Sequence, residues 1–170
     1  MTDRKDTCLL YHNFYSLYSI MVRYTYALRG APADPDAEIV LREEIRSIKA
    51  GELLTEHFLC NVNSHGEVPV LVPEDGAGKP IPDSVAITHF LAERYPGLMP
   101  EEQEGEMKRL LERLHEINFF PLTFFGKPDM QQQKLAFLEA QLHEKISERY
   151  RKAVVDVSRR LVHEGETTAA

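Results

Sequence analysis

The stretch CLLYHNFYSLYSIMVRYTYALRG, residues 8–30, decides the fold. It opens with a short apolar run at residues 8–11, which is typical of a buried strand. A turn at residues 12–16 leads into a helical pattern over residues 17–29, whose apolar residues recur every three or four positions and form one stripe. Gly30 ends this helix, as glycine commonly does. The residues of the stripe are Leu17, Ile20, Met21, Tyr24 and Leu28. The stretch therefore predicts a strand that passes through a short turn into a helix.

The same alternation of strands and helices continues along the chain, with turn residues between the segments. The predicted segments are a strand at 38–42, a helix at 53–60, strands at 70–72 and 79–82, and a helix at 84–94. The helical crossover between the first two strands predicts that they pair in parallel. The tight turn between the last two strands predicts an antiparallel pair.

Helix formers dominate the chain beyond residue 96. Two long helices are predicted there, at residues 103–120 and 129–162, each with apolar residues at helical spacing. The change in pattern predicts two domains, residues 1–96 and 97–170. Both helices expose wide apolar stripes that need a partner surface, so we expect a homodimer.

Composition excludes several classes of protein. The 170 residues include 20 Lys and Arg and 27 Asp and Glu, which gives a net charge of −7. This balance argues against nucleic-acid binding, because neutralising phosphates requires a basic surface. Two cysteines without a Cys-x-x-Cys motif argue against a disulfide scaffold and against a zinc site. No apolar run suits a membrane span or a signal peptide, so we expect a cytoplasmic protein that does not bind membranes and holds no metal.

Two local motifs could present backbone groups or charges to a ligand. Val68-Pro69 stands at the start of the third strand, where proline marks either the first strand residue or a cis turn. Either arrangement can leave the Val68 backbone free to pair with an extended peptide, although a plain strand-initiating turn is the alternative. Asp83-Ser84 starts a helix as an N-cap, and free amides beside a carboxylate could there hold both charges of an amino-acid end.

Ser16 is the third candidate, at the junction between the first strand and the first helix. Its simplest role is that of an N-cap. A hydroxyl in this position could instead donate a hydrogen bond to a thiolate, and the positive end of the helix would strengthen the effect.

Together these features resemble the glutathione transferase superfamily, in particular its Ser- and Cys-type members and fungal relatives. The matching stretches are LLYHNFYSLYSIMVRYTYALRG (9–30), NVNSHGEVPVLV (61–72) and DSVAITHFLAERYP (83–96). They occur in the order and at the spacing of that family's thioredoxin-like domain, and the resemblance covers roughly residues 8–100. It implies an α/β fold: a thioredoxin-like N-terminal domain followed by a short all-α C-terminal domain.

The resemblance also implies roles for individual residues. Val68, before a cis Pro69, would pair its backbone with the cysteinyl part of glutathione. Asp83 and Ser84 match the acidic-Ser pair that holds the γ-glutamyl end. Ser16 falls where Ser- and Cys-type members carry the residue that activates the thiol. Glutathione would be a co-substrate.

The sequence departs from the family pattern in two places. Glu67 stands where many relatives have Lys or Gln near the glycyl carboxylate, so a nearby cation is needed, and Lys49 is the candidate, with Arg46 and His57 as alternatives. The helical part is also shorter than is usual in the family. An apolar substrate pocket is expected between the sheet and the first long helix, lined by Phe14, Tyr15, Tyr18, Phe119 and Phe120.

These features favour an enzyme that adds the glutathione thiolate to an apolar, electrophilic small molecule. A variant of the same chemistry is a glutathione-dependent cis-trans isomerase of conjugated double bonds in specialised-metabolite biosynthesis. A non-catalytic binding or scaffold protein of the same fold is the alternative from another class. A thiol-disulfide oxidoreductase would require a cysteine in the place of Ser16.

Overall fold

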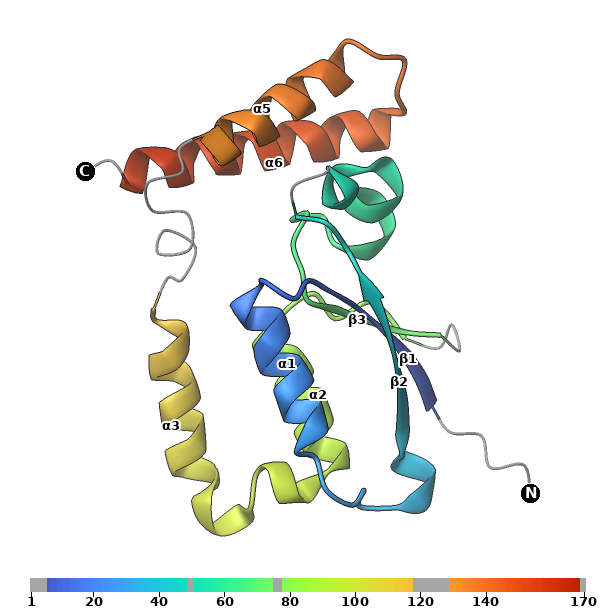
Figure 1. Cartoon of the computed structure of the whole chain (residues 1–170), viewed down its shortest axis with the longest axis vertical. Helices are drawn as coiled ribbons and strands as arrows, with labels where there is room; N and C mark the ends of the chain where they lie inside the picture. The colour runs from blue at the N-terminus through green and yellow to red at the C-terminus, as the bar shows by residue number, and fades with distance from the viewer. Residues whose placement is uncertain (1–5, 49–50, 75–77, 118–128, 169–170) are drawn as a thin grey trace. The chain divides into compact units, whose positions relative to one another are not determined.

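The structure is a computed structural model that describes residues 6–48, 51–74, 78–117 and 129–168 (Figure 1). Packing divides the chain into two compact units. The first unit comprises Met1–Arg46 and Val68–Ile117, and the second comprises Ser47–Glu67 and Asn118–Ala170. This grouping differs from a division of the chain at residue 96, and the predicted domains 1–96 and 97–170 stay a prediction.

The first unit is built on a sheet of three strands in the order β2-β1-β3. These are β1 (Asp6–His12), β2 (Ile39–Ile45) and β3 (Val70–Pro73). β1 is central: it pairs with β2 in parallel and with β3 in antiparallel orientation. The predicted parallel pairing of the first two strands is therefore confirmed, together with the α/β class of an N-terminal βαβ unit followed by helices. The antiparallel pairing of β1 with β3 was not predicted.

The strand predicted at residues 79–82 is reduced to a single bridge, in which Ile81 pairs with Leu71. The Ile81 amide donates to the Leu71 carbonyl at 2.8 Å, and the Leu71 amide donates to the Ile81 carbonyl at 3.0 Å. Pro80 and Pro82 flank Ile81 and have no N–H to donate, so the pairing cannot extend as a ladder. The bridge still fixes the position of this segment beside β3.

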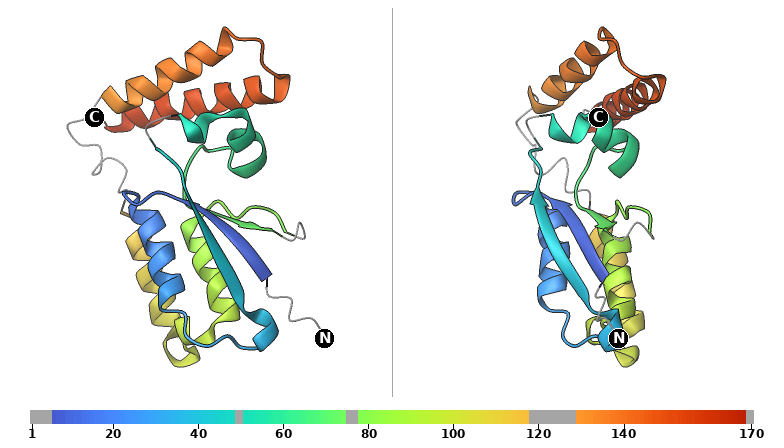
Figure 2. Two further views of the ribbon diagram at one scale, coloured as in Figure 1. Left: turned by 45° about the vertical axis from the view of Figure 1, so that its right-hand side comes forward. Right: turned by 90° about the vertical axis from the view of Figure 1, so that its right-hand side faces the viewer.

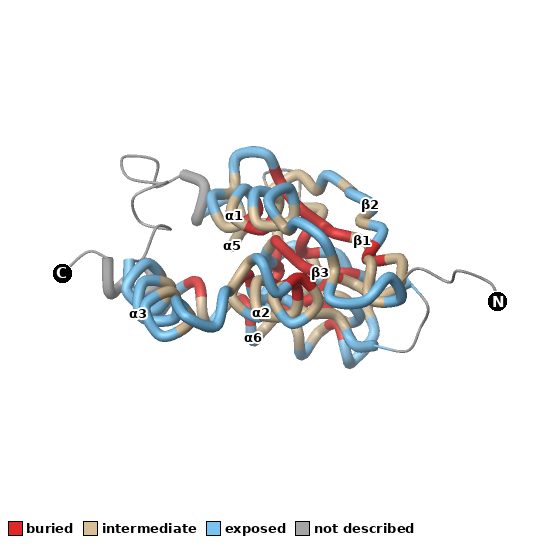
Figure 3. Tube along the Cα trace, turned by 90° about the horizontal axis from the view of Figure 1, so that it is seen from below, coloured by how far each residue is buried: buried red, intermediate tan, exposed pale blue. Residues whose placement is uncertain are grey.

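Helices α1 (Leu17–Ala27) and α2 (Ser84–Arg94) pack on one face of this sheet (Figures 1 and 2). The core between helices and sheet takes side chains from all three strands and both helices. Its members are Cys8, Leu10, Val22, Ile39, Leu71, Ile87, Leu91 and Tyr95. Cys8 and Leu10 point to this face because alternate strand residues share a face. β1 and β3 both carry fully buried residues, drawn in red in Figure 3.

The apolar stripe of α1 is not the face that packs on the sheet. Leu17, Ile20, Tyr24 and Leu28 are all exposed, Tyr24 by 65%, whereas Ser19 and Val22 are buried. Tyr26 explains why the other face packs inward, because its hydroxyl donates to the Ile39 carbonyl at 2.8 Å and accepts from the Leu41 amide at 3.3 Å. Both faces of α1 carry apolar groups, so spacing alone did not indicate which one is buried.

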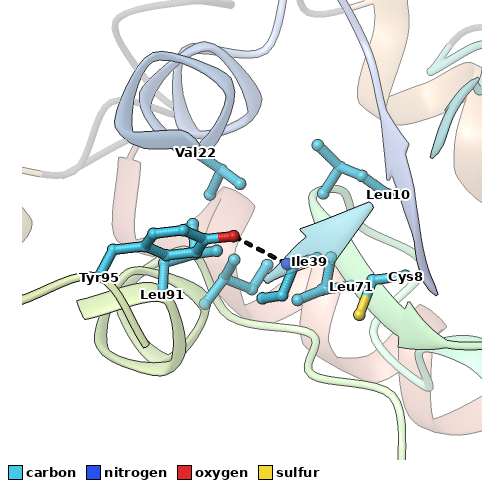
Figure 4. Close-up of a cluster of buried hydrophobic side chains, with 8 residues drawn as sticks. Cys8, Leu10, Val22, Ile39, Leu71, Leu91 and Tyr95 are labelled. Atoms are coloured by element: carbon cyan, nitrogen blue, oxygen red, sulfur yellow. Dashed lines mark hydrogen bonds between the residues drawn. The ribbon is translucent and has the colours of Figure 1, made fainter. Parts of the chain in front are cut away.

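Tyr95 joins the end of α2 to the start of β2. Its ring is fully buried in the core, and its hydroxyl accepts a hydrogen bond from the Ile39 amide at 2.8 Å (Figure 4). Ile39 is the first residue of an edge strand, and Tyr95 gives its buried N–H a partner. The contact thus fixes where β2 begins.

Helix α3 (Glu104–His115) is the last helix of the first unit. It corresponds to the helix that the sequence predicted at residues 103–120. Its apolar stripe is largely exposed: Leu110 by 49%, Leu114 by 36%, and Ile117 beyond its end by 45%. The homodimer expected from such a stripe stays a prediction.

The second unit shows that the helix predicted at residues 129–162 is two helices, α5 (Asp129–Leu142) and α6 (Glu148–Thr168). Ser147 starts α6, because its hydroxyl accepts from the Tyr150 amide at 3.1 Å. The apolar stripe of α6 was predicted to be exposed, and this prediction is wrong. The stripe packs on α5 and on residues 54 and 59 in one buried cluster: Leu54, Leu59, Leu138, Tyr150, Val154, Val157 and Leu161.

The helix predicted at residues 53–60 is likewise split, into a 3-10 turn η2 (Glu52–Leu54) and a π-helical turn η3 (Phe58–Val62). Thr55 separates them in an extended conformation, which interrupts the helical hydrogen bonds. Among the described residues, no helix is both long enough and apolar enough to cross a membrane.

We expect Tyr95→Phe to lower the free energy of unfolding by about 1–3 kcal/mol. The substitution removes only the hydroxyl, which accepts a hydrogen bond from the buried Ile39 amide. Urea denaturation followed by circular dichroism measures the loss. Tyr24→Phe removes the same atom from an exposed ring and should change stability by less than about 0.5 kcal/mol. Equal effects of both substitutions would contradict the role assigned to Tyr95.

Candidate functional site

Strand register brings three chain segments to one end of the sheet in the first unit. Tyr11 pairs with Val70, so the chain that leaves β1 toward Ser16 lies at the same end as the residues that precede β3. Leu71 pairs with Ile81 in antiparallel orientation, so the chain after Ile81 also runs toward that end. The β1–α1 turn, Val68-Pro69 and Asp83-Ser84 therefore share one end of the sheet.

Ser16 is the N-cap of α1, as its position in the sequence predicts. Its backbone is extended, and its Oγ accepts a hydrogen bond from the Ser19 amide at 3.3 Å. The cap uses a lone pair of the hydroxyl and not its proton. The partly exposed Ser16 hydroxyl can therefore cap the helix and donate to another acceptor at the same time.

Asn13 holds the turn that carries Ser16. Its amide group is buried and donates from Nδ2 to the Arg46 carbonyl at 2.7 Å, while Oδ1 accepts from the Tyr15 amide at 2.9 Å. Its backbone adds two contacts, because the Asn13 N–H donates to Ser19 Oγ at 3.3 Å and its carbonyl accepts from the Ser16 amide at 3.1 Å. Asn13 thus ties β1, β2 and α1 together at the point where Ser16 begins its helix.

The Val68–Pro69 peptide bond is cis, as the resemblance implied. Pro69 is buried and Val68 is partly exposed. The ladder between β1 and β3 begins at Val70, so the Val68 backbone lies outside it. Among the described residues, no backbone–backbone hydrogen bond involves Val68.

Asp83 and Ser84 begin α2 as predicted. Asp83 Oδ1 accepts from the Ala86 amide at 2.8 Å, so one carboxylate oxygen caps the helix. The Asp83 side chain is exposed, which leaves its charge accessible, whereas Ser84 is buried. The N-terminal ends of α1 and α2 thus both begin with a hydroxyl or carboxylate cap at this end of the sheet.

The other expected site residues lie in the β1–α1 turn and α1 or outside the described residues. Lys49, Phe119 and Phe120 lie outside the described residues. In the β1–α1 turn, Phe14 is 50% exposed and Tyr15 is 85% exposed. The substrate pocket that these residues and Tyr18 were expected to line stays a prediction.

Glu67 and Arg46 were expected near the glycyl end of the glutathione site. The Glu67 side chain is exposed, and its carbonyl accepts from Asn63 Nδ2 at 2.9 Å. Arg46, one of the alternatives to Lys49, pairs with Glu44 at 2.5 Å and stacks over Tyr11, so its charge already has a partner.

A buried histidine lies beside this turn and was not singled out by the sequence. His12 ends β1, and its side chain is fully buried. Its Nε2 lies 3.7 Å from Glu43 Oε2, and its ring meets Phe14 edge-on with centroids 5.1 Å apart. The motif His-Asn-Phe-Tyr-Ser indicates a turn, but only the register of β1 on β2 brings Glu43 to His12.

Burial lowers the pKa of the His12 imidazole below its ordinary value, because the charged ring is disfavoured away from water. Glu43 opposes this shift, and Arg23 adds to it. No group of three or more His, Cys, Asp or Glu side chains is arranged to hold a metal ion in the described part of the chain.

Comparison with known proteins gives a likeness in structure alone. No protein-family model matches the chain, and no curated protein matches it significantly. A delta-class glutathione transferase of Nilaparvata lugens shares 20% identity at a TM-score of 0.49 and covers 88% of this chain. A tau-class glutathione S-transferase of mango, Mangifera indica, shares 20% identity at a TM-score of 0.42 and covers 94%.

The chain is structurally similar to delta- and tau-class glutathione transferases over most of its length, at low sequence identity. It spans 62% of the length of the first and 61% of the second.

We expect the free energy of unfolding to fall as pH falls below about 6.5. The folded state lowers the pKa of His12, so the unfolded chain binds the proton first and stability is lost through the window between the two pKa values. One such proton contributes a slope of at most about 1.4 kcal/mol per pH unit. Urea denaturation between pH 5 and 7.5 measures the slope, and His12→Gln should flatten it. An unchanged slope in that variant would contradict the prediction.

Proposed function

We propose that this chain is a glutathione-dependent transferase that adds the glutathione thiolate to an apolar, electrophilic small molecule. The observation that carries the proposal is the Ser16 hydroxyl, whose oxygen accepts from the Ser19 amide through a lone pair. This cap does not use the hydroxyl proton, which can therefore donate to a thiolate. A hydroxyl used in this way stabilises a thiolate without losing the helix cap.

The energetics support a serine in this role. A free thiol has a pKa of about 8.5, so only a few per cent is ionised near pH 7. A hydrogen bond to a charged group contributes roughly 1.5–3 kcal/mol. At about 1.36 kcal/mol per unit, that bond lowers the thiol pKa by roughly one to two units. A large share of the bound thiol is then thiolate, which is the nucleophilic form.

The remaining groups at this end of the sheet suit the rest of the tripeptide. Val68 offers an N–H and a carbonyl outside the β3 ladder, which fit the backbone of the cysteinyl residue. The exposed Asp83 carboxylate suits the γ-glutamyl ammonium, and the first-turn amides of α2 beside Ser84 suit its carboxylate. Lys49 is proposed to balance Glu67 at the glycyl end.

The reaction forms one carbon–sulfur bond. The thiolate attacks the electrophilic carbon, and the electron pair leaves with the displaced group or passes to a conjugated acceptor that then takes a proton from water. The apolar co-substrate is proposed to contact aromatic side chains, namely Phe14, Tyr15, Tyr18, Phe119 and Phe120. Mass spectrometry of the product tests the reaction type, because conjugation adds the mass of glutathione whereas isomerisation leaves the substrate mass unchanged.

Ser16→Ala should lower kcat for thiol transfer by about 10- to 100-fold, which is the rate equivalent of the lost hydrogen bond to the thiolate. Its effect on glutathione affinity should be several times smaller. Steady-state kinetics with an electrophilic aromatic substrate and titration calorimetry measure the two quantities. Ser16→Thr keeps both the hydroxyl and the cap, and should retain most activity. A rate unchanged by Ser16→Ala between pH 6 and 8 would overturn the assignment.

Asp83→Asn should weaken glutathione binding by about tenfold or more, because it removes the negative charge opposite the ammonium group. Asparagine is an equally good N-cap, so α2 keeps its first hydrogen bond and the loss reports on the charge alone. Asp34→Asn, in the N-cap of the short 3-10 helix at Pro35–Ala37, is the matched control and should leave affinity unchanged. Titration calorimetry gives both values. Wild-type affinity in Asp83→Asn would refute the proposed γ-glutamyl contact.

A further inference from the structure

His12 is an ionisable side chain that the fold buries without satisfying it. It is fully buried at the end of β1, and neither Nδ1 nor Nε2 has a hydrogen-bond partner among the described residues. An unpaired buried polar group costs free energy, so such a group calls for an explanation. Its position is informative, because the turn that follows it carries Ser16.

In the described part of the chain, the charged groups that face His12 come from β2 and α1. Glu43, from β2, places Oε2 at 3.7 Å from His12 Nε2 and accepts from Arg23 Nε at 2.8 Å through Oε1. Arg23, from α1, also lies over the Phe14 ring at 5.0 Å. Arg46 donates its backbone N–H to the His12 carbonyl at 2.8 Å, but its side chain is engaged with Glu44 and Tyr11. His12, Glu43, Arg23 and Phe14 therefore form a closed ring of contacts.

Phe14 connects this ring of contacts to Ser16. It covers the buried imidazole edge-on and is itself half exposed. It lies between Asn13 and Tyr15, which are joined by the Asx hydrogen bond, and the Ser16 amide donates to the Asn13 carbonyl. A displacement of Phe14 is therefore passed on to the residue that caps α1.

We propose that His12 is a proton-operated control of the β1–α1 turn, which sets the position of the Ser16 hydroxyl. In the neutral form, Arg23 holds Glu43 and Phe14 covers the imidazole. When Nδ1 or Nε2 takes up a proton from water, the imidazolium lies near the Arg23 cation, and Glu43 is the carboxylate within reach. Glu43 then turns from Arg23 to His12, Arg23 leaves the Phe14 ring, and the turn shifts. The consequence for glutathione rests on the proposed function, whereas the motion does not.

Nuclear magnetic resonance of the full chain without glutathione tests the motion. The His12 ring and the backbone amides of Ser16 and Ser19 are followed between pH 4.5 and 7.5. We expect one shared inflection below about pH 6.5. Glu43→Gln should move it to lower pH and Arg23→Gln to higher pH, each by about 0.2–0.7 unit, the size that partly exposed charges produce. Glu44→Gln, whose carboxylate pairs with Arg46, should leave it in place.

The proposal is overturned if the Ser16 amide shows no inflection, or one that neither Glu43→Gln nor Arg23→Gln displaces. His12→Gln should abolish the inflection, and the Glu43 and Arg23 variants, altered at side chains that are 38% and 33% exposed, decide the matter if His12→Gln fails to fold. A shared inflection in a chain that does not bind glutathione would refute the proposed function alone. Glutathione binding without a shared inflection would refute only the proposed role of His12.

Discussion

The position of β1 between β2 and β3 is the constraint on which the candidate site depends. Because β1 is parallel to β2, its last residue lies beside Ile45, and because it is antiparallel to β3, its last residues lie beside the start of β3. The same pairing carries over to Ile81 through Leu71. The segments that hold Ser16, Val68 and Asp83 are distant in the sequence, and no local preference could bring them to one end of the sheet. Register does so.

The two ends of β2 are held in different ways, and the difference bears on function. At its start, hydroxyls satisfy the backbone: Tyr95 accepts from the Ile39 amide, and Tyr26 donates to the Ile39 carbonyl. At its far end, Asn13 satisfies the Arg46 carbonyl, while the neighbouring His12 has no hydrogen bond to its ring among the described residues. An unsatisfied ionisable group therefore lies directly beside the hydrogen-bonded turn that Asn13 holds.

Local signals in the sequence were sufficient where one residue decides a boundary. Asp83 was expected to cap the helix to Arg94 and does so, and Ser16 was expected to start the first helix. Where tertiary packing decides, the sequence was insufficient. The apolar stripe of α1 is largely exposed, whereas the opposite face is buried and carries the hydrogen bonds of Tyr26. The continuous pattern over 129–162 concealed a break that the Ser147 cap could have indicated. The contact between His12 and Glu43 could not be predicted without the register of β1 on β2.

In the proposed control, the unsatisfied His12 makes this end of the sheet adjustable without a loss of its backbone contacts. A histidine with two satisfied nitrogens would gain little by changing partners, whereas His12 has a carboxylate at 3.7 Å that is already shared with Arg23. His12, Glu43 and Arg23 all carry charge only when His12 is protonated. Glu43 and Arg23 are partly exposed, so the proposal needs only a small free-energy difference between the two pairings of Glu43. Asn13 meanwhile ties the turn to the Arg46 carbonyl and limits how far the turn can shift. A proton can therefore shift side chains beside Ser16 without unfolding the helix that Ser16 caps.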